Sequence, residues 1–298
     1  MVVIRRVIFL KLVIENVSKK YKDKWAVRDF SAEMTDGVYG LLGPNGSGKT
    51  TLMRMLASIL KPTSGRILLD DQDISTLDET YRDVLGYLPQ EFGLYQNFTA
   101  ERFLAYFASL KGLDKSIAKD KIAEVLALVN LTEHKRKKTK TFSGGMKRRL
   151  GIAQALLNDP KILVVDEPTA GLDPKERIHF RNLISNISRE RIVILSTHIV
   201  SDIEFIAKEI FIMDQGVLKE RSDLAGLLTG LKGKVWEASM TETEFASLQG
   251  QYKIGNIQRN EYGVKLRLIS DEKPHDQAVE VPATLEDVYL YYFGEEAI

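Results

Sequence analysis

The stretch GPNGSGKTT, residues 43–51, lies between an apolar run at 38–42 and an apolar-periodic segment at 50–56. The run predicts a buried strand, and the periodic segment predicts a helix. Three glycines let the backbone curl, so that successive N–H groups point inward around phosphate oxygens at the partly positive end of that helix. Lys49 can reach the terminal phosphates, and the Thr50 hydroxyl can bind magnesium.

A plain strand-to-helix turn needs one or two glycines and has no use for an adjacent Lys-Thr pair, so the pattern predicts a nucleotide site. The residues expected to contact the nucleotide here are Gly43, Pro44, Asn45, Gly46, Ser47, Gly48, Lys49, Thr50 and Thr51.

Two further apolar runs end in polar side chains that could complete the site. Residues 162–165 precede Asp166 and Glu167, and such a run predicts a strand buried on both faces, with its carboxyl end toward the ligand. Asp166 could hold magnesium and Glu167 could accept a proton from an attacking water, or the two carboxylates could simply cap the strand. Residues 191–197 precede His198, which could contact the γ-phosphate on the same side of the sheet.

Bulk properties narrow the class of protein. A chain of 298 residues suits one large domain with a smaller one. Its net charge of +1 argues against a general affinity for nucleic acid, and the absence of cysteine excludes disulfides and thiolate metal sites. Residues 1–14 are interrupted by charges and are too short to span a bilayer, so we expect any work at a membrane to need another chain that crosses it.

The stretch TFSGGMKRRL, residues 141–150, resembles the signature motif of ATP-binding cassette (ABC) proteins. With the phosphate loop, the Asp-Glu pair and His198 in this order, residues 10–220 are similar to the nucleotide-binding subunit of an ABC transporter. The resemblance implies an α/β fold: a P-loop NTPase core of the ABC type, an antiparallel β subdomain and an inserted helical subdomain. It also implies an ATPase that uses ATP and Mg2+. Phe142 and Met146 depart from the usual leucine and glutamine.

The resemblance also implies a dimer of cassettes, identical or different. Ser143, Gly144 and Gly145 are expected to bind the γ-phosphate of ATP held by the other cassette, so that ATP joins the two subunits. Asp173 resembles the residue of the loop that crosses this interface. Tyr21 lies where the family stacks an aromatic ring on adenine, although a surface tyrosine would look the same in the sequence.

Gln90 resembles the glutamine that senses magnesium and water and leads toward the membrane subunit. The expected metal site is Thr50, Gln90 and Asp166. The expected catalytic set is Glu167, His198 and Gln90.

We expect an ABC ATP-binding domain at 10–221, with a helical subdomain at about 91–154, and a small α+β accessory domain at 222–298. The phrase PATLEDVYL, residues 282–290, resembles the tail of export-type cassette subunits, which act with a separate polytopic permease. The expected location is therefore cytoplasmic, peripheral on the inner face of the cell membrane.

Three local expectations concern packing. Residues 10–17 should form the first strand, whereas 1–9 are either an extra edge segment or an upstream start of translation. The loop 91–98 should dock the permease through exposed aromatics, Phe92 and Tyr95. An apolar stripe in a helix at 100–111 should be core packing, and it consists of Phe103, Leu104, Phe107 and Leu110.

The competing hypothesis is a soluble ABC-type ATPase that acts on nucleic acid or ribosomes. Such relatives usually carry two cassettes or long coiled-coil insertions, and this sequence has neither. The basic run at 134–140 lacks interleaved aromatics, so we expect a solvated loop, or one near anionic lipid, and no nucleic-acid partner.

Overall fold

The computed structural model describes residues 10–248, 250–261 and 263–294. The expectation for residues 1–9 lies outside this range. The chain divides into two compact units, of which the first ends at Glu220 and the second begins at Arg221. Each unit is described by itself below.

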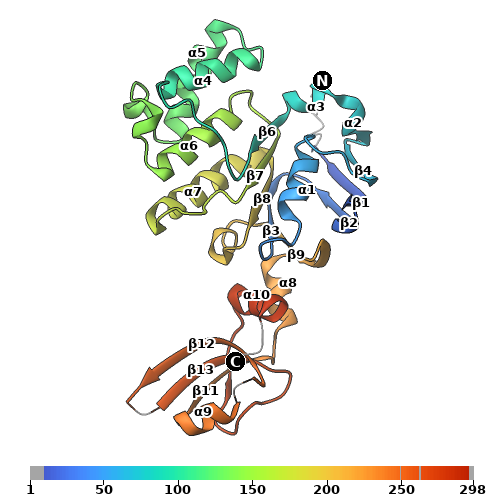
Figure 1. Cartoon of the computed structure of the whole chain (residues 1–298), viewed down its shortest axis with the longest axis vertical. Coiled ribbons are helices and arrows are strands. Elements are labelled where there is room, and N and C mark those ends of the chain that lie inside the picture. Colours follow the sequence, from blue (N-terminus) through green and yellow to red (C-terminus); the bar gives the residue numbers. More distant parts are fainter. Residues whose placement is uncertain (1–9, 249, 262, 295–298) are drawn as a thin grey trace, which may run out of the picture. The chain divides into compact units, whose positions relative to one another are not determined.

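A six-stranded sheet forms the centre of the first unit (Figure 1), in the order β10-β9-β3-β8-β7-β6. Its pairings β6–β7, β7–β8, β8–β3 and β3–β9 are parallel. Every residue of β7 and β8 is buried, as their unbroken apolar runs predict. The strands are β3 (Gly37–Leu42), β6 (Leu85–Leu88), β7 (Ile162–Asp166), β8 (Ile192–Thr197), β9 (Glu209–Asp214) and β10 (Val217–Ser222).

A second sheet of this unit, β2-β1-β4-β5, is antiparallel in all its pairings. The expected antiparallel β subdomain is confirmed, and in it the first strand pairs with β4, where Leu12 lies opposite Leu69. The predicted end of the first strand at residue 17 was wrong, because pairing with β2 continues to Tyr21, opposite Lys24. The strands are β1 (Leu12–Tyr21), β2 (Lys24–Met34), β4 (Ser64–Leu69) and β5 (Gln72–Asp73).

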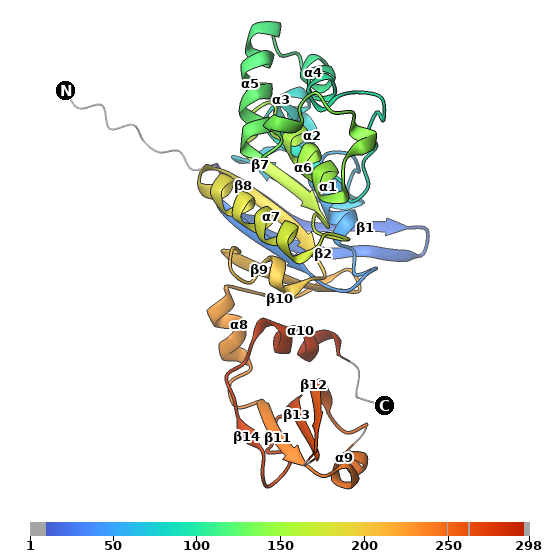
Figure 2. The same cartoon turned by 90° about the vertical axis from the view of Figure 1, so that its left-hand side faces the viewer.

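Helices pack on the central sheet and form a separate group between β6 and β7. The helices are α1 (Lys49–Leu56), α2 (Ile74–Leu77), α3 (Glu79–Asp83), α4 (Ala100–Leu110), α5 (Lys115–Leu128), α6 (Gly144–Ala155) and α7 (Pro174–Ile187), with 3-10 turns at Thr132–His134, Thr139–Thr141, Ser188–Glu190 and Val200–Asp202. Helices α4 and α5 pack on each other and lie away from β1 and β2 in both views (Figure 2).

Helix α4 shows how the local sequence and the packing agree. The Thr99 hydroxyl accepts a hydrogen bond from Arg102 N and caps the helix. Phe103 and Leu104 are fully buried, but Leu110 is 64% exposed. The prediction for Leu110 was wrong because it is the last residue of the helix, and the buried stripe ends at Ala108.

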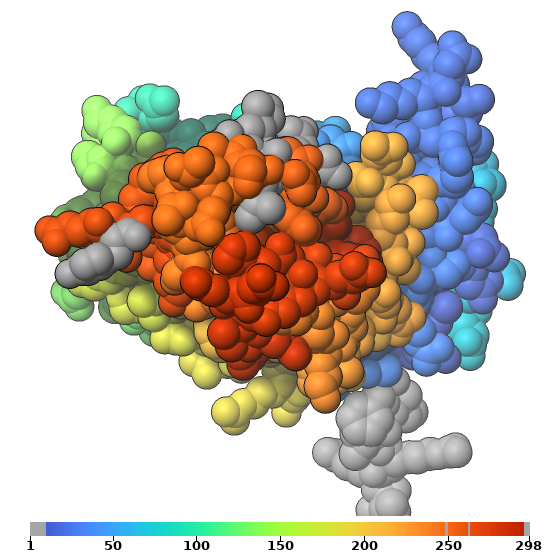
Figure 3. Space-filling model, turned by 90° about the horizontal axis from the view of Figure 1, so that it is seen from below, coloured from blue at the N-terminus to red at the C-terminus, as the bar shows by residue number. Residues whose placement is uncertain are grey.

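The second unit is an α+β fold around the sheet β12-β13-β11-β14. Its elements are α8 (Leu224–Gly230), β11 (Val235–Met240), α9 (Glu242–Leu248), β12 (Lys253–Asn260), β13 (Gly263–Ile269), β14 (Val279–Glu280) and α10 (Leu285–Phe293). One face of the sheet packs on Phe245 of α9, and α10 contacts β12. The orange to red surface that faces the viewer in Figure 3 belongs to this unit.

Among the residues that the structure describes, no helix combines the length and the apolar character needed to cross a bilayer.

Candidate functional site

The loop between β3 and α1 has a backbone that requires glycine at two places. Gly48 has φ 103°, and a Cβ there would lie 2.2 Å from the carbonyl oxygen of Ala26. A Cβ on Gly43 would lie 2.2 Å from the carbonyl oxygen of Met213. The loop can therefore pack against its neighbours only because these side chains are missing, and helix α1 begins directly after it at Lys49.

Lys49 folds back into this loop. Its Nζ donates to the carbonyl oxygens of Gly43 (2.7 Å) and Pro44 (3.0 Å), and it lies 3.5 Å from Glu167 Oε1. The side chain is only 5% exposed. Burial lowers the pKa of Lys49, while the charges of Glu167 and Asp166 oppose that shift. The ammonium group thus stands between the loop and both predicted carboxylates.

Asp166 and Glu167 lie at the carboxyl end of β7, and one hydroxyl holds both. Ser196 Oγ donates to Asp166 Oδ1 and accepts from the backbone N–H of Glu167 at 3.0 Å. Thr50 Oγ1 lies 3.4 Å from the same Asp166 oxygen. Ser196 was absent from the predicted site, although it stands opposite Asp166 in the register of the parallel strands. The strand order that makes them neighbours was the missing information.

His198 lies next to Glu167. Its Nδ1 is 2.8 Å from Glu167 Oε2, and its ring is 40% exposed, whereas the Glu167 side chain is 5% exposed. Glu167 has φ 45°, a left-handed conformation that is uncommon outside glycine. The structure therefore brings together Lys49, Thr50, Asp166, Glu167 and His198 from three separate segments of the chain.

Several buried polar atoms at this place have no hydrogen-bond partner among the described residues. They are Ser47 Oγ, Asp166 Oδ2 and Glu167 Oε1. Within the same part of the chain, no group of three His, Cys, Asp or Glu side chains could hold a metal by itself. Mg2+ is usually held by one or two carboxylates together with substrate phosphates and water, so the donors present at Thr50 and Asp166 fit that ion.

The predicted signature residues and the phosphate loop of one chain do not come together. Ser143 Oγ caps α6 by accepting from Met146 N at 3.2 Å, and open space surrounds Gly144. Asp173 caps α7 by accepting from Glu176 N at 2.9 Å. In the described part of the chain, no hydrogen bond or ion pair joins Ser143, Gly145 or Asp173 to the phosphate loop.

Tyr21 lies at the end of β1 and is 47% exposed, with Lys19 Nζ at 5.6 Å from its ring centroid. The exposed ring is free of core packing, as a stacking position requires.

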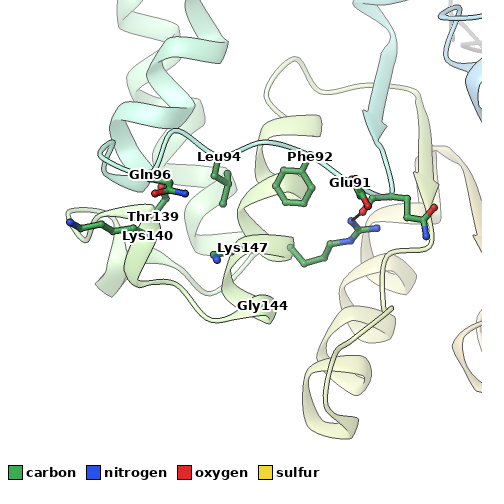
Figure 4. Close-up of a pocket in the computed structure, with 10 residues that line it drawn as sticks. Glu91, Phe92, Leu94, Gln96, Thr139, Lys140, Gly144 and Lys147 are labelled. Atoms are coloured by element: carbon green, nitrogen blue, oxygen red, sulfur yellow. Dashed lines mark hydrogen bonds between the residues drawn. The ribbon is translucent and has the colours of Figure 1, made fainter.

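Gln90 is exposed, and across the described residues its side chain makes no hydrogen bond to Thr50, Asp166 or Glu167. It stands instead at a groove of about 460 Å³ (Figure 4). The groove is lined by Gln90, Glu91, Phe92, Leu94, Gln96, Thr139, Lys140, Gly144, Lys147 and Arg148.

The two aromatic residues of loop 91–98 that were expected to be exposed differ in their exposure to solvent. Tyr95 is 47% exposed, as predicted. Phe92 is partly buried, because its ring lies over Gly151 of α6, where a Cβ would come within 2.7 Å of it. The prediction for Phe92 was therefore wrong, although the ring still forms part of the groove.

Comparison with known proteins identifies the family. A model described as ABC transporter matches residues 28–170. The chain is 38% identical over 233 residues to the uncharacterized ABC transporter ATP-binding protein YxlF of Bacillus subtilis, covering 78% of this chain and 77% of that protein. It is 37% identical over 224 residues to the linearmycin resistance ATP-binding protein LnrL of the same organism, covering 74% and 72%.

The chain is also similar to a protein named for export and to a solved structure that contains a bound nucleotide. The Nod factor export ATP-binding protein I of Burkholderia orbicola is 36% identical over 203 residues, covering 67% of each chain. A solved dimeric, post-hydrolysis ATP-binding cassette bound to ADP and Pi matches with a TM-score of 0.65 at 25% identity, covering 72% of this chain and 98% of that one. The chain therefore belongs to the ABC transporter ATP-binding proteins, and its activity is ATP hydrolysis.

Proposed function

We propose that this chain is the ATPase subunit of an ABC exporter, and that two cassettes closing on ATP drive a separate polytopic permease. One observation carries the proposal: Lys49, Asp166, Glu167 and His198 converge at the phosphate loop, while open space surrounds Gly144 of the signature. A triphosphate held by one copy can then meet the signature turn of another.

Each residue of the site has a proposed part in hydrolysis. The loop from Gly43 to Thr51 holds the triphosphate, with Lys49 turned from its own carbonyls toward the terminal phosphates. Thr50 and Asp166, with Gln90 after closure, would hold Mg2+, which would supply positive charge against the phosphates of ATP. Glu167 accepts the proton of the attacking water.

The 2.8 Å contact between His198 and Glu167 supports a part for His198 in orienting that carboxylate. Its 40% exposure leaves the ring open to the phosphate side.

The second copy supplies the remaining contacts. Ser143, Gly144 and Gly145 bind the γ-phosphate at the N-terminus of α6, and Asp173 crosses the interface. Tyr21 stacks on adenine. Loss of the γ-phosphate removes the contacts that favour the closed dimer, so the dimer opens after hydrolysis.

The groove beside Gln90 is the proposed docking site of the permease. It is lined by loop 91–98 and by α6, so it adjoins the segment that leads into the site. Export is favoured by the names of two relatives, for linearmycin resistance and Nod factor export, and by the PATLEDVYL phrase at 282–290. The protein would then lie at the inner face of the cell membrane through its permease.

The test of the mechanism is Glu167→Gln, which preserves shape and removes the base. We expect kcat to fall by roughly 100-fold or more, because positioned general bases contribute 10²–10⁴-fold. The variant should elute as a dimer with ATP and Mg2+ and as a monomer with ADP, whereas wild type should dimerise only briefly. Wild-type turnover by the variant would contradict the assignment of Glu167.

Co-purification from solubilised membranes separates the two functional classes. A polytopic membrane protein bound to the chain is the expected result. Ribosomes or RNA retained in place of it would favour the soluble ATPase.

A further inference from the structure

Arg148 of α6 joins several loops that meet at the site, and it is not among the residues expected to contact the nucleotide, bind the metal or act in catalysis. Its Nε donates to the carbonyl oxygen of Pro168 at 2.8 Å, and Nη2 donates to that of Asp166. Nη1 donates to the carbonyl oxygens of Pro89 (3.1 Å) and Gln90 (2.9 Å). One guanidinium thus binds four backbone carbonyls from two segments.

These four carbonyls have a specific placement. Asp166 and Pro168 are the two neighbours of Glu167 in the chain, and Pro89 and Gln90 follow β6, which pairs with β7. Glu167 itself has the left-handed φ of 45°, which persists only where the surroundings hold the backbone. The contacts on both sides of Glu167 supply such a restraint.

The guanidinium is held mainly by carbonyls. It is 8% exposed, and a guanidinium keeps its proton in proteins, so a buried positive charge stands here. A buried cation needs its hydrogen-bond acceptors in place, and displacement of any one carbonyl is costly. The four carbonyls are therefore coupled in position through this side chain.

The same side chain lies at the proposed docking groove. Arg148 lines it together with Phe92, which Figure 4 labels. The guanidinium carbon is 5.8 Å from the centroid of the Phe92 ring. The Phe92 ring rests on Gly151, one turn along α6 from Arg148. An occupant of the groove that moves Gln90 therefore moves an acceptor of Arg148, and one that moves Phe92 changes the packing of Arg148.

We propose that Arg148 is a positioning residue that sets the backbone around Glu167 and links it to the state of the groove. This inference rests on the proposed function, because it concerns the same hydrolytic site. It predicts that Arg148 affects the rate of the chemical step more than the affinity for ATP.

The experiment compares Arg148→Gln with a matched control, Arg191→Gln, in the full chain. Arg191 also donates to backbone carbonyls, those of Pro160 and Ile187 at 2.9 Å each, but it lies just before β8, at the opposite end of that strand from Ser196. The measurements are kcat and KM for ATP, and ATP-driven dimerisation of each variant combined with Glu167→Gln.

For Arg148→Gln we expect kcat to fall roughly 100-fold, as for a misplacement of about 1 Å, with KM within about 3-fold of wild type. Dimerisation in the Glu167→Gln background should be retained, because Glu167 no longer needs positioning. For the same reason the residual rate of the double variant should equal that of Glu167→Gln alone. Arg191→Gln should keep the wild-type kcat.

An unchanged kcat in Arg148→Gln, or a loss of dimerisation with a parallel rise in KM, would overturn the inference while leaving the proposed function intact. If Arg148→Gln does not fold, Arg148→Lys decides: it keeps the charge but cannot reach four carbonyls, so kcat should still fall. Full activity of the lysine variant would overturn the inference. Wild type that neither hydrolyses ATP nor dimerises would overturn the proposed function, and the inference with it.

Discussion

Asp287, in the PATLEDVYL phrase, is expected to hold helix α10 on the sheet of the second unit. Its carboxylate accepts from Arg267 Nε at 2.9 Å and from Arg267 Nη2 at 2.7 Å. It also accepts from the backbone N–H and the hydroxyl of Thr284, both at 2.7 Å, which completes a capping box. Replacing Asp287 by asparagine removes the charge and keeps the shape.

The loss of stability in Asp287→Asn depends on how deeply the ion pair is buried and on the hydrogen-bond partners that Arg267 keeps. The Asp287 side chain is 4% exposed and Arg267 is 21% exposed, and removing one member of a buried pair costs about 3–5 kcal/mol. Arg267 keeps the carbonyl of Pro282 at 2.7 Å and Glu237 at 3.4 Å, and asparagine can still accept from Thr284. We therefore expect Asp287→Asn to lower the free energy of unfolding of the second unit by about 2–3 kcal/mol, which is less than the full cost of breaking a buried ion pair.

The pH dependence has a definite direction. Burial opposes ionisation of Asp287, but hydrogen bonds from Arg267 and Thr284 outweigh it and lower its pKa. Its contribution to stability is therefore complete above the unfolded pKa of about 3.9 and is lost as pH falls through the folded value. The difference between wild type and Asp287→Asn should be full at pH 7 and should shrink below about pH 4.

Hydrogen exchange of the full chain, followed by mass spectrometry, measures this directly. Peptides from α10, β12 and β13 should lose protection by roughly 30- to 100-fold at pH 7, since each tenfold corresponds to about 1.4 kcal/mol. Glu286→Gln is the control, because Glu286 is exposed in the same helical turn and carries the same charge. Equal protection in Asp287→Asn and Glu286→Gln would show that the ion pair between Arg267 and Asp287 does not hold α10 on the sheet.

Two further substitutions test the site itself. Lys49→Ala should weaken ATP binding by roughly 100-fold in calorimetry, because a charge-assisted contact to phosphate is lost, and wild-type affinity would contradict the phosphate-loop assignment. Ser196→Ala should lower kcat by about 10-fold or more with little change in the Kd for ATP, because Asp166 Oδ1 then keeps only Thr50 at 3.4 Å and the backbone N–H of Glu167 keeps only the carbonyl oxygen of Ser196 at 3.2 Å. An equal loss of affinity and rate would show that Ser196 acts on binding instead.

The sequence by itself determined the elements that depend on neighbouring residues. Glycines at 43–48 define the phosphate loop because only they fit its backbone, Thr99 and Ser143 cap their helices, and unbroken apolar runs form buried strands. The convergence of Asp166, Glu167 and His198 could be predicted as well, since each follows a strand whose carboxyl end faces the ligand side.

Only the tertiary structure decided which distant groups share a hydrogen bond. Ser196 bonds the Asp166 carboxylate and the Glu167 backbone N–H because β8 lies beside β7. Arg148 reaches four carbonyls because α6 packs against β6, and Asp287 meets Arg267 within the second unit. Such contacts depend on strand order, register and helix docking, which bring together residues 18 to 59 positions apart and leave no mark in the local pattern. Burial of Phe92 and exposure of Leu110 were decided in the same way, by the helix surface that each one meets.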